Sequence, residues 1–196
     1  MQAVSYPLKQ FVADCERIVR GSRNETDTLR DLRPLLEKLL RQNGSVPEGA
    51  FKPRRDRFAM NLLYIPTDQA FSIIGGVWHP GQTTSIHDHL TWALIGVYTG
   101  REREALYRRL DDASNPKFAK VEKVSERINE QGHVTVLAHS GIHKVDNPSS
   151  DTPTHSVHVY GRDIGNLERH SYNPVTGEIG KFVSGYCNVL RDTDPY

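Results

Sequence analysis

The chain has 196 residues, of which 25 are Lys or Arg and 24 are Asp or Glu, so its formal net charge is +1. This balance gives no large field of one sign, and we therefore expect neither a nucleic acid nor a membrane surface as a partner. The length is ample for one hydrophobic core, and no apolar run approaches the length of a membrane span. We expect one domain, residues 1–196, that acts on a small molecule.

Cysteine usage indicates a reducing compartment. Cys15 and Cys187 are too few for a disulfide framework, and the N-terminal residues lack a basic segment followed by an apolar run. We therefore expect a cytoplasmic protein, which exists as a monomer or a small homo-oligomer.

Residues 7–42 carry apolar side chains near a 3.6-residue period, which predicts two amphipathic helices. The break between them is expected at residues 21–24, and Asn43 with Gly44 indicates the end of the second helix. Cys15 falls on the apolar face of the first helix, which indicates a small buried hydrophobic residue rather than a redox centre. We expect residues 1–45 to form a helical N-terminal extension.

From Gly44 onward the sequence consists of short β-rich runs divided by Gly, Pro, Asn and Asp. The runs expected to form strands are residues 58–65, 70–78, 91–98, 101–108, 121–128, 134–137 and 155–160. Many short strands at this spacing predict a mostly β sandwich or barrel over residues 46–196. Gly75 and Gly76 lie inside one run, where they indicate a bulge or the close approach of another backbone segment.

A pair of histidines follows the glycine turn at Gly81. His87 and His89 are two residues apart, so on a strand both imidazoles point to the same face. Two surface histidines would be the simpler interpretation of an isolated pair. However, a second glycine turn at Gly132 is followed by His143, and neutral imidazoles are good ligands for iron, zinc, copper or nickel. The three histidines could therefore bind one metal ion.

The spacing around the first pair resembles the first motif of the cupin family of β barrels. Its pattern is G-x5-H-x-H-x3/4-E-x6-G, and Gly81, His87, His89 and Gly100 occupy the corresponding positions. Ala93 stands where the motif has its glutamate. The resemblance therefore implies a site in which no carboxylate from this motif joins the histidines.

The second cupin motif, G-x5-P-x-G-x2-H-x3-N, is matched in part. Gly132, His143 and Asn147 occupy its positions, whereas Ala138 and Ser140 replace the proline and the second glycine. Because two separate gapped patterns agree, we interpret the chain as similar to a cupin whose metal has three neutral histidine ligands.

Residues 154–161 alternate in character. Ser156, His158 and Tyr160 fall on one face of the expected strand, and Val157 and Val159 fall on the other. The first three, which we call the Ser-His-Tyr row, could relay hydrogen bonds, with the serine orienting the imidazole and the imidazole setting the proton of the phenol. A structural network inside a β barrel would give the same pattern.

Several stretches are similar to the cysteine dioxygenase superfamily of thiol dioxygenases, and most of all to its bacterial 3-mercaptopropionate dioxygenase branch. They are residues 78–81 (WHPG), 86–89 (IHDH), 92–96 (WALIG), 156–161 (SVHVYG), 164–165 (IG) and 182–186 (FVSGY). The similarity extends from Phe58 to Asn188, and the N-terminal helices suit the family. It implies a cupin fold, the double-stranded β-helix or jelly-roll barrel, with two N-terminal α-helices.

This resemblance also implies roles for single residues. The residues that match the ligands of the cofactor, Fe(II), are His87, His89 and His143. The Ser-His-Tyr row, Ser156, His158 and Tyr160, matches the catalytic triad beside the iron. Arg169, nine residues after the tyrosine, matches the arginine that holds the substrate carboxylate in the mercaptopropionate branch.

Two positions depart from the family pattern. The animal cysteine enzymes carry a cysteine, crosslinked to the tyrosine, near the position of Ala93, so that no such crosslink can form here. Met60 aligns with a substrate-binding arginine of the cysteine enzymes and a glutamine of the mercaptopropionate enzymes, and its thioether removes one polar contact to the substrate. Cys187 lies elsewhere in the pattern, and we expect it in the core or at the margin of the site.

The expected chemistry follows from the charge of the site. Three neutral imidazoles would leave Fe(II) with its full double positive charge and with open positions on one face, which favours an anionic thiolate. Arg169 could hold a carboxylate in a bidentate pair, and Tyr160 would donate a hydrogen bond into the site. We therefore expect a small thiol and O2 as partners, and insertion of both oxygen atoms into sulfur to give a sulfinate.

Two other classes of protein share parts of this pattern. A dioxygenase that cleaves a carbon–carbon bond of a β-diketone also uses three histidines in a cupin, but it would have less need for Arg169 or the row. A non-catalytic cupin that binds a small acid would be expected to carry an effector domain, and the N-terminal helices lack a convincing helix-turn-helix pattern. The histidines outside the motifs are expected in loops or in packing: His79, His133, His139, His155 and His170.

Overall fold

The computed structural model describes residues 6–188. Within them the chain begins with helices and continues mainly as short strands. The helices are α1 (Leu8–Gly21), α2 (Glu25–Leu40) and a single 3₁₀ turn, η1 (Glu48–Ala50). The strands are β1 (Ala59–Tyr64), β2 (Ser72–Trp78), β3 (Ile86–Asp88), β4 (Ala93–Thr99), β5 (Arg101–Arg109), β6 (Val121–Glu130), β7 (Val134–Leu137), β8 (Ile142–Asp146), β9 (Thr154–Tyr160), β10 (Arg169–Tyr172) and β11 (Ile179–Phe182).

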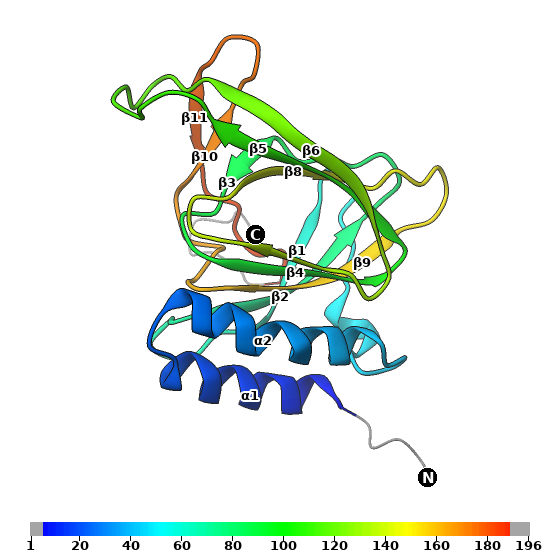
Figure 1. The fold of residues 1–196 in the computed structure, drawn as a ribbon. Coiled ribbons are helices and arrows are strands. Elements are labelled where there is room, and N and C mark those ends of the chain that lie inside the picture. Colours follow the sequence, from blue (N-terminus) through cyan, green and yellow to red (C-terminus); the bar gives the residue numbers. More distant parts are fainter. Residues whose placement is uncertain (1–5, 189–196) are drawn as a thin grey trace, which may run out of the picture.

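The strands form two antiparallel sheets that face each other, as Figure 1 shows. One sheet has the order β1-β2-β9-β4-β7 and the other has the order β11-β10-β3-β8-β5-β6. Strands far apart in the chain become neighbours, because β9 lies between β2 and β4 while β3 lies between β8 and β10. The prediction of a mostly β cupin barrel with two N-terminal helices is confirmed.

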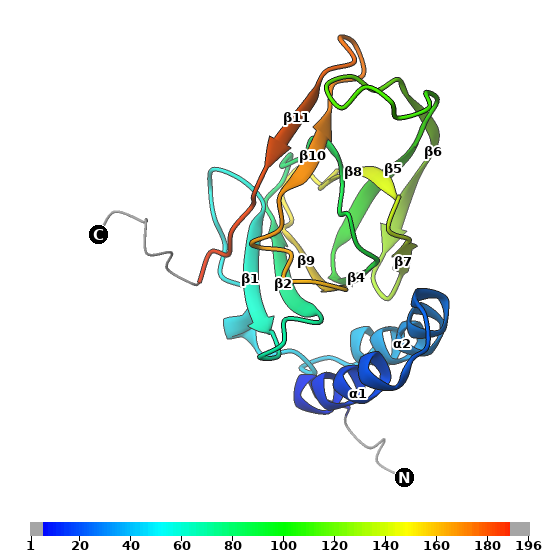
Figure 2. The ribbon, with the colours of Figure 1, turned by 90° about the vertical axis from the view of Figure 1, so that its left-hand side faces the viewer.

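The two α-helices cover the outer face of the five-stranded sheet and leave the barrel interior to the strands (Figures 1 and 2). Their apolar faces form one core cluster with the outward-facing side chains of that sheet. Gly96 of β4 allows this close packing, since a Cβ there would lie 2.5 Å from Leu40 and 3.2 Å from Leu36 of α2.

The two helices are separated where the sequence indicated a break. α1 ends at Gly21, and the side chain of Asn24 caps α2 by accepting a hydrogen bond of 2.9 Å from the backbone N–H of Asp27. Cys15 is fully buried on the inner side of α1, and burial raises the pKa of its thiol. The interpretation of Cys15 as a small core residue therefore agrees with the structure.

Alternation along β9 separates two of the core clusters of the described residues. Val157 and Val159 pack in the cluster shared with the helices, whereas Tyr160 packs in a second cluster inside the barrel. Ser156 and His158 are buried on the same side as Tyr160. The strand therefore carries apolar residues toward the helices and polar residues into the barrel.

Gly75 and Gly76 in β2 mark a close approach, as expected, without a bulge between β2 and β9. A Cβ on Gly75 would lie 2.3 Å from the backbone oxygen of Ala50 in η1. A Cβ on Gly76 would lie 2.6 Å from Oγ of Ser156 and 2.8 Å from the ring of Phe58. Both glycines therefore make room for neighbouring segments on opposite faces of the strand.

Four strands were not among the expected runs. They are β3, β8, β10 and β11, each of three to five residues. Their sequences contain His, Lys, Asp, Arg or Gly, which have no strong β propensity, so pairing with neighbouring strands determines where they form. The strand expected over residues 91–98 begins later, at Ala93, and β6 continues to Glu130.

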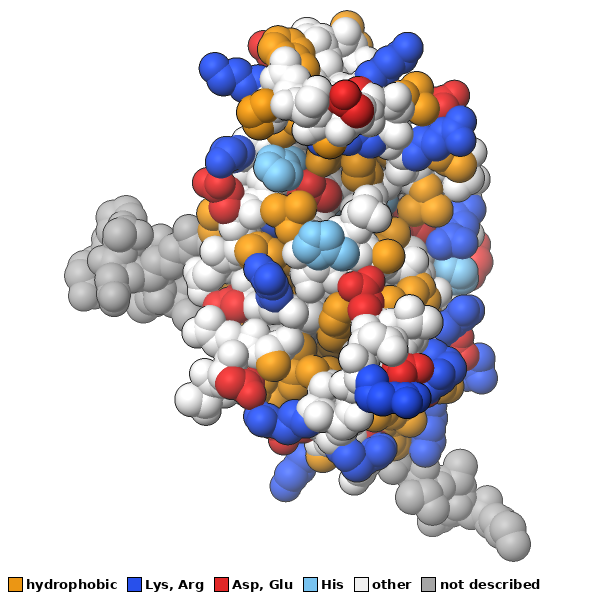
Figure 3. Space-filling view, turned by 60° about the vertical axis from the view of Figure 1, so that its left-hand side comes forward, with side chains coloured by type: hydrophobic (Ala, Val, Ile, Leu, Met, Phe, Trp, Pro, Cys, Tyr) orange, Lys and Arg blue, Asp and Glu red, His pale blue; other side chains and the backbone are white. Residues whose placement is uncertain are grey.

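Charged side chains of both signs are mixed on the face shown in Figure 3, with no broad patch of one sign. Apolar side chains on that face occur in small groups between them. None of the helices in residues 6–188 combines the length and the apolar character needed to cross a membrane.

Candidate metal centre

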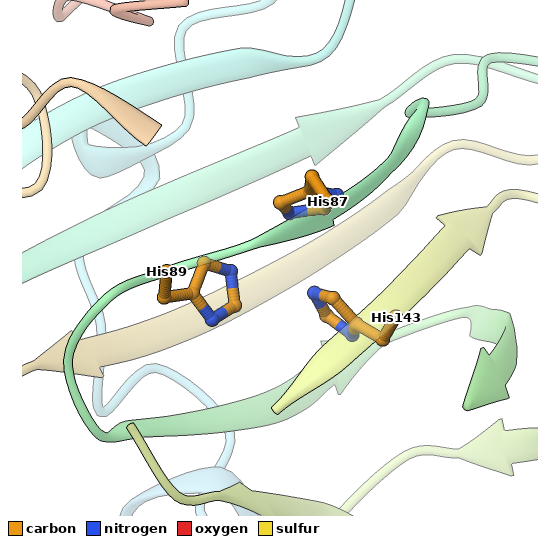
Figure 4. Close-up of side chains that lie close together, drawn as sticks. All are labelled: His87, His89 and His143. Carbon is orange, nitrogen blue, oxygen red and sulfur yellow. The ribbon is translucent and has the colours of Figure 1, made fainter. Parts of the chain in front are cut away.

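Three buried histidines converge inside the barrel, as Figure 4 shows. His87 on β3 and His143 on β8 are register partners in an antiparallel pair, so their side chains share one face. His89 follows two residues after His87 and turns toward the same point. The ring centroids are 4.7 to 5.0 Å apart, and one nitrogen from each ring lies within 4.8 Å of the other two.

Hydrogen bonds fix two of these rings. Nδ1 of His87 lies 3.0 Å from the backbone oxygen of Ser85, and Nδ1 of His143 lies 3.0 Å from Oε1 of Glu104. Because each Nδ1 must donate to an oxygen, Nε2 keeps its lone pair for another ligand. Nδ1 of His89 is buried and has no hydrogen-bond partner among the described residues.

The environment keeps the imidazoles of His87 and His89 neutral. Burial lowers the pKa of His87 and of His89 well below the usual 6.5, and the positive charge of Arg169 lowers both further. Neutral imidazoles are the form that binds a transition metal. Three converging buried imidazoles, together with a buried nitrogen of His89 that the described protein leaves unsatisfied, therefore fit a bound metal ion.

Glu104 of β5 anchors the third histidine, and the sequence analysis did not identify it. Its Oε1 accepts from His143, and its Oε2 accepts from Thr135 (2.7 Å), Asn129 (3.0 Å) and Arg127 (3.0 Å). Burial raises the pKa of this carboxyl, but hydrogen bonds from His143, Thr135 and Asn129 outweigh burial and bring it to about 2. Glu104 is therefore an ionised acceptor that fixes the His143 ring.

The Ser-His-Tyr row is continuous. Nδ1 of His158 lies 2.8 Å from the hydroxyl of Tyr160, and Nε2 lies 2.8 Å from Oγ of Ser156. The Tyr160 ring meets His89 edge to face, with centroids 5.0 Å apart. Burial raises the pKa of Tyr160, so the phenol keeps its proton beside the histidine cluster.

Arg169, at the start of β10, is a buried cation near the histidines, with 3% of its surface exposed. Its Nη2 donates to Oγ of Ser184 at 2.7 Å, and its guanidinium lies over the Phe182 ring at 4.6 Å. Within residues 6–188 it has no carboxylate partner, and its Nε has no hydrogen-bond partner. Burial lowers its pKa, which indicates that the site would be stabilised by an anion.

These side chains share one cavity of about 300 Å³. It is lined by Arg57, Phe58, Met60, Thr83, Thr84, Ser85, His87, Tyr160, Arg169, Phe182, Val183, Ser184, Gly185 and Cys187. A histidine of the cluster, the tyrosine of the row and the buried arginine therefore face the same space. Its size suits a small organic molecule.

Of the two positions that depart from the family pattern, Met60 lies at this cavity and Ala93 lies beside Tyr160. Met60 lines the cavity, and the backbone oxygen of Met60 accepts a 2.7 Å hydrogen bond from the N–H of Cys187. Cys187 is a margin residue, as expected. Ala93 is the register partner of Tyr160, which places a methyl group beside the tyrosine and leaves no thiol there for a crosslink.

The other histidines lie outside the cluster. His155 faces away from the row, where its Nδ1 lies 3.0 Å from Oγ1 of Thr99 and its ring stacks on Phe51. His170 is half-buried and its Nδ1 lies 2.9 Å from Asp88. Neither ring lines the cavity, in agreement with the expectation that these histidines serve packing.

The family model described as cysteine dioxygenase type I matches residues 55–172. Cysteine dioxygenase type 1 from Bos taurus is 29% identical over 145 residues, which cover 71% of this chain and 68% of that protein. The enzyme of the same name from Rattus norvegicus is 28% identical over 145 residues, with the same coverage. The residues matched by the family model contain the histidine cluster, the row and the arginine.

Solved structures with a similar arrangement include the crystal structure of the protein TT1209 from Thermus thermophilus. It has a TM-score of 0.44 and 15% identity, over 59% of this chain and 92% of that chain. The cupin domain of Cnp3 from Schizosaccharomyces pombe has a TM-score of 0.43 and 6% identity, over 57% of this chain and 65% of that chain.

Proposed function

The chain belongs to the cysteine dioxygenase type I family, and we therefore propose that it is a non-haem Fe(II) thiol dioxygenase. The substrate would be a small carboxylate-bearing thiol, such as 3-mercaptopropionate, cysteine or a related thiol. The reaction is R–SH + O2 → R–SO2H, so both oxygen atoms enter the sulfinate. One observation carries the proposal: a buried arginine without a carboxylate partner in residues 6–188 and a tyrosine hydroxyl face the cavity of the three-histidine cluster.

The residues proposed to hold the metal are His87, His89 and His143. Bound there, Fe(II) would supply a doubly charged site for a thiolate and the electrons that activate O2. Neutral imidazoles add no negative charge, and the position of the cupin glutamate is occupied by Ala93, which is buried. The ligand set therefore favours an anionic sulfur over a neutral molecule.

Substrate orientation is assigned to Arg169. A carboxylate that enters the cavity would complete the hydrogen bonding of a guanidinium already held by Ser184 and Phe182. Because the cation is fixed and buried, it would hold the sulfur end of the thiol toward the histidines. Met60 adds an apolar wall, so we propose that it influences which thiol is accepted through shape rather than through a second polar contact.

The catalytic role proposed for the row is to hold a proton at the hydroxyl of Tyr160. The phenol lies against the ring of His89 and lines the cavity, so its O–H can donate to groups that bind near the histidines. His158 and Ser156 set the orientation of that hydroxyl through two hydrogen bonds of 2.8 Å.

The test is anaerobic reconstitution with Fe(II), followed by measurement of oxygen uptake and sulfinate formation. Substrates would be 3-mercaptopropionate, cysteine, mercaptosuccinate and cysteamine, of which only the last lacks a carboxylate. We expect consumption of at least one of the carboxylate thiols with one sulfinate formed per O2. His143→Ala is the control that removes a ligand, and it should consume neither oxygen nor thiol.

Two results would favour other functions. Consumption of a β-diketone, with no reaction of any thiol, would indicate a dioxygenase that cleaves a carbon–carbon bond. Tight binding of a small acid without turnover would indicate a non-catalytic cupin. Neither alternative explains why Arg169 and the row both face the histidine cluster.

We propose that residues 1–196 form one domain, that the protein is cytoplasmic, and that it is a monomer or a small homo-oligomer without a nucleic-acid partner. Size-exclusion chromatography with light scattering would measure the oligomeric state, and limited proteolysis would show whether the helical extension separates from the barrel.

A further inference from the structure

Strand β5 turns two carboxylates into the barrel, and the metal centre accounts for only one of them. Glu102 and Glu104 are each 1% exposed, and a buried carboxylate ordinarily has partners because an unpaired interior charge is costly. Glu104 bonds to His143 and to three other side chains. Oε1 of Glu102 has no hydrogen-bond partner among the described residues, so its burial needs another explanation.

Glu102 lies at the serine end of the Ser-His-Tyr row. The side chains of Ser156 and Trp78 donate hydrogen bonds to the carboxyl group of Glu102, and both bonds lower its pKa. Nε1 of Trp78 also donates to Oγ of Ser156 at 3.3 Å, and both residues are fully buried or nearly so. With two further steps of 2.8 Å through His158, one path of polar side chains joins Glu102 to the hydroxyl of Tyr160 at the cavity.

The imidazole in the middle of this path carries one ring proton. Burial lowers the pKa of His158 to about 3, so the ring is neutral at working pH. One of its nitrogens must donate while the other accepts. The path can therefore run in either of two directions, and something outside the ring must select between them.

We propose that Glu102 is a positioning residue that sets the direction of the hydrogen bonds in the row. When Glu102 is ionised, the Ser156 hydroxyl donates to it and Nε2–H of His158 donates to Ser156. Nδ1 of His158 then accepts a hydrogen bond from the hydroxyl of Tyr160. The phenol proton therefore points along the row and not into the cavity.

Protonation of Glu102 reverses each bond. The carboxylic acid donates to Oγ of Ser156, and the serine hydroxyl donates to Nε2 of His158. The ring proton then resides on Nδ1 and is donated to the oxygen of Tyr160, so the phenol proton is free to point into the cavity. One added proton on the carboxyl is the only change in the proton count of the path.

The groups around Glu102 place this change near neutral pH. Burial raises the pKa of its carboxyl to about 7, the negative charge of Glu104 on the same strand raises it, and hydrogen bonds from Ser156 and Trp78 lower it. Across the sheet its register partner is the uncharged Asn129. The charge of Glu102 in turn raises the pKa of Tyr160, which stays protonated in both states.

The direct test uses metal-free protein labelled with ¹⁵N-histidine and ¹³C-glutamate, followed by NMR between pH 5 and 9. His158→Gln identifies the signals of His158. We expect the protonated nitrogen of this ring to change from Nδ1 at low pH to Nε2 at high pH, in step with titration of the Glu102 carboxyl. In Glu102→Gln the tautomer should stay constant over that range.

A tautomer that stays constant in the wild-type protein while Glu102 titrates would overturn the inference. The same change occurring in Glu102→Gln would also overturn it. This measurement needs no turnover, so it stands whether or not the proposed dioxygenase activity is found. Glu122→Gln, which alters a half-exposed carboxyl on β6 paired with Arg108, is the matched control and should leave the His158 signals unchanged.

The consequence for activity rests on the proposed function. Above the transition, Glu102→Gln should turn over faster than the wild type by up to about tenfold, because the amide N–H donates to Ser156 permanently and frees the phenol proton. In a Tyr160→Phe background the same substitution should change kcat by less than about twofold. An equal effect in both backgrounds would show that Glu102 acts on the fold rather than through the tyrosine.

Discussion

The carboxylate of Glu104 lies 3.0 Å from Nδ1 of His143, and both side chains are buried. Their strands, β5 and β8, are neighbours in the six-stranded sheet, so the contact is held by the backbone ladder between them. The carboxylate selects the tautomer with the proton on Nδ1 and leaves Nε2 facing the other histidines. A contact outside the cluster therefore determines which nitrogen the cluster presents.

Replacement of Glu104 by Gln should weaken metal binding. The amide carries no charge to stabilise the Nδ1 proton of His143, and loss of such a partner typically lowers metal affinity by roughly 10- to 100-fold. Anaerobic competition between the protein and a chelator for Fe(II) measures the change. Glu122→Gln, on an exposed face of β6, should bind as the wild type does, and unchanged affinity in Glu104→Gln would contradict the role.

Residue spacing was sufficient to predict which side chains of the motifs share a face. His87 and His89 share a face because strand side chains alternate, and the same rule placed Ser156, His158 and Tyr160 together. The turns at Gly81 and Gly132 have φ of +76° and +86°, which explains why glycine occupies these motif positions. Spacing alone did not identify Arg169, and a family resemblance was needed.

The two carboxylates of β5 could not be identified in the same way. Glu102 and Glu104 alternate with Arg101 and Arg103, a pattern that is equally typical of a solvated strand with charges on both faces. Which face is buried depends on the neighbours, β6 and β8, and strand order is not encoded in local periodicity. The short strands β3, β8 and β10 were missed for the same reason, since each pairs with a strand far along the chain.

Replacement of Arg169 by Ala should abolish selective capture of acidic thiols. Removing one side of a buried, hydrogen-bonded charge pair costs on the order of 2–5 kcal/mol, which corresponds to a fall of a few decades in kcat/KM. Steady-state oxygen uptake with 3-mercaptopropionate or cysteine measures the fall, and cysteamine, which has no carboxylate, should lose far less.

The control for this change is Arg162→Ala, which removes an exposed cation outside the cavity and should leave both substrates unaffected. Equal losses for acidic and neutral thiols in Arg169→Ala would show that the arginine supports the fold. In that case the requirement for a carboxylate would have to be abandoned.

Replacement of Gly75 by Ala should destabilise the fold. The added methyl group would lie 2.3 Å from the backbone oxygen of Ala50, so η1 must move away from β2, and overpacking of this kind typically costs about 1–3 kcal/mol. Urea denaturation measures the free energy of unfolding. Gly49→Ala, one residue before the contact and with no atom within 4 Å of its added Cβ, should change it by far less.

The last prediction concerns the pH dependence of stability that Glu102 imposes. Burial raises the pKa of this carboxyl from the usual 4.5 to about 7 in the folded protein. Between these values the folded state binds more protons than the unfolded state, so the free energy of unfolding must fall as pH rises. The contribution is fully present below pH 4.5 and is lost as pH passes through about 7.

Glu102→Gln removes this contribution, because an amide does not titrate. The two proteins should therefore differ little near pH 5, while the variant should become the more stable one above pH 8, by on the order of 3 kcal/mol for a shift of this size. Urea denaturation at several pH values measures the difference. The other titratable groups are common to both proteins, so their contributions cancel in the comparison. A difference between Glu102→Gln and the wild type that stays constant with pH would mean that the Glu102 carboxyl titrates at an ordinary value.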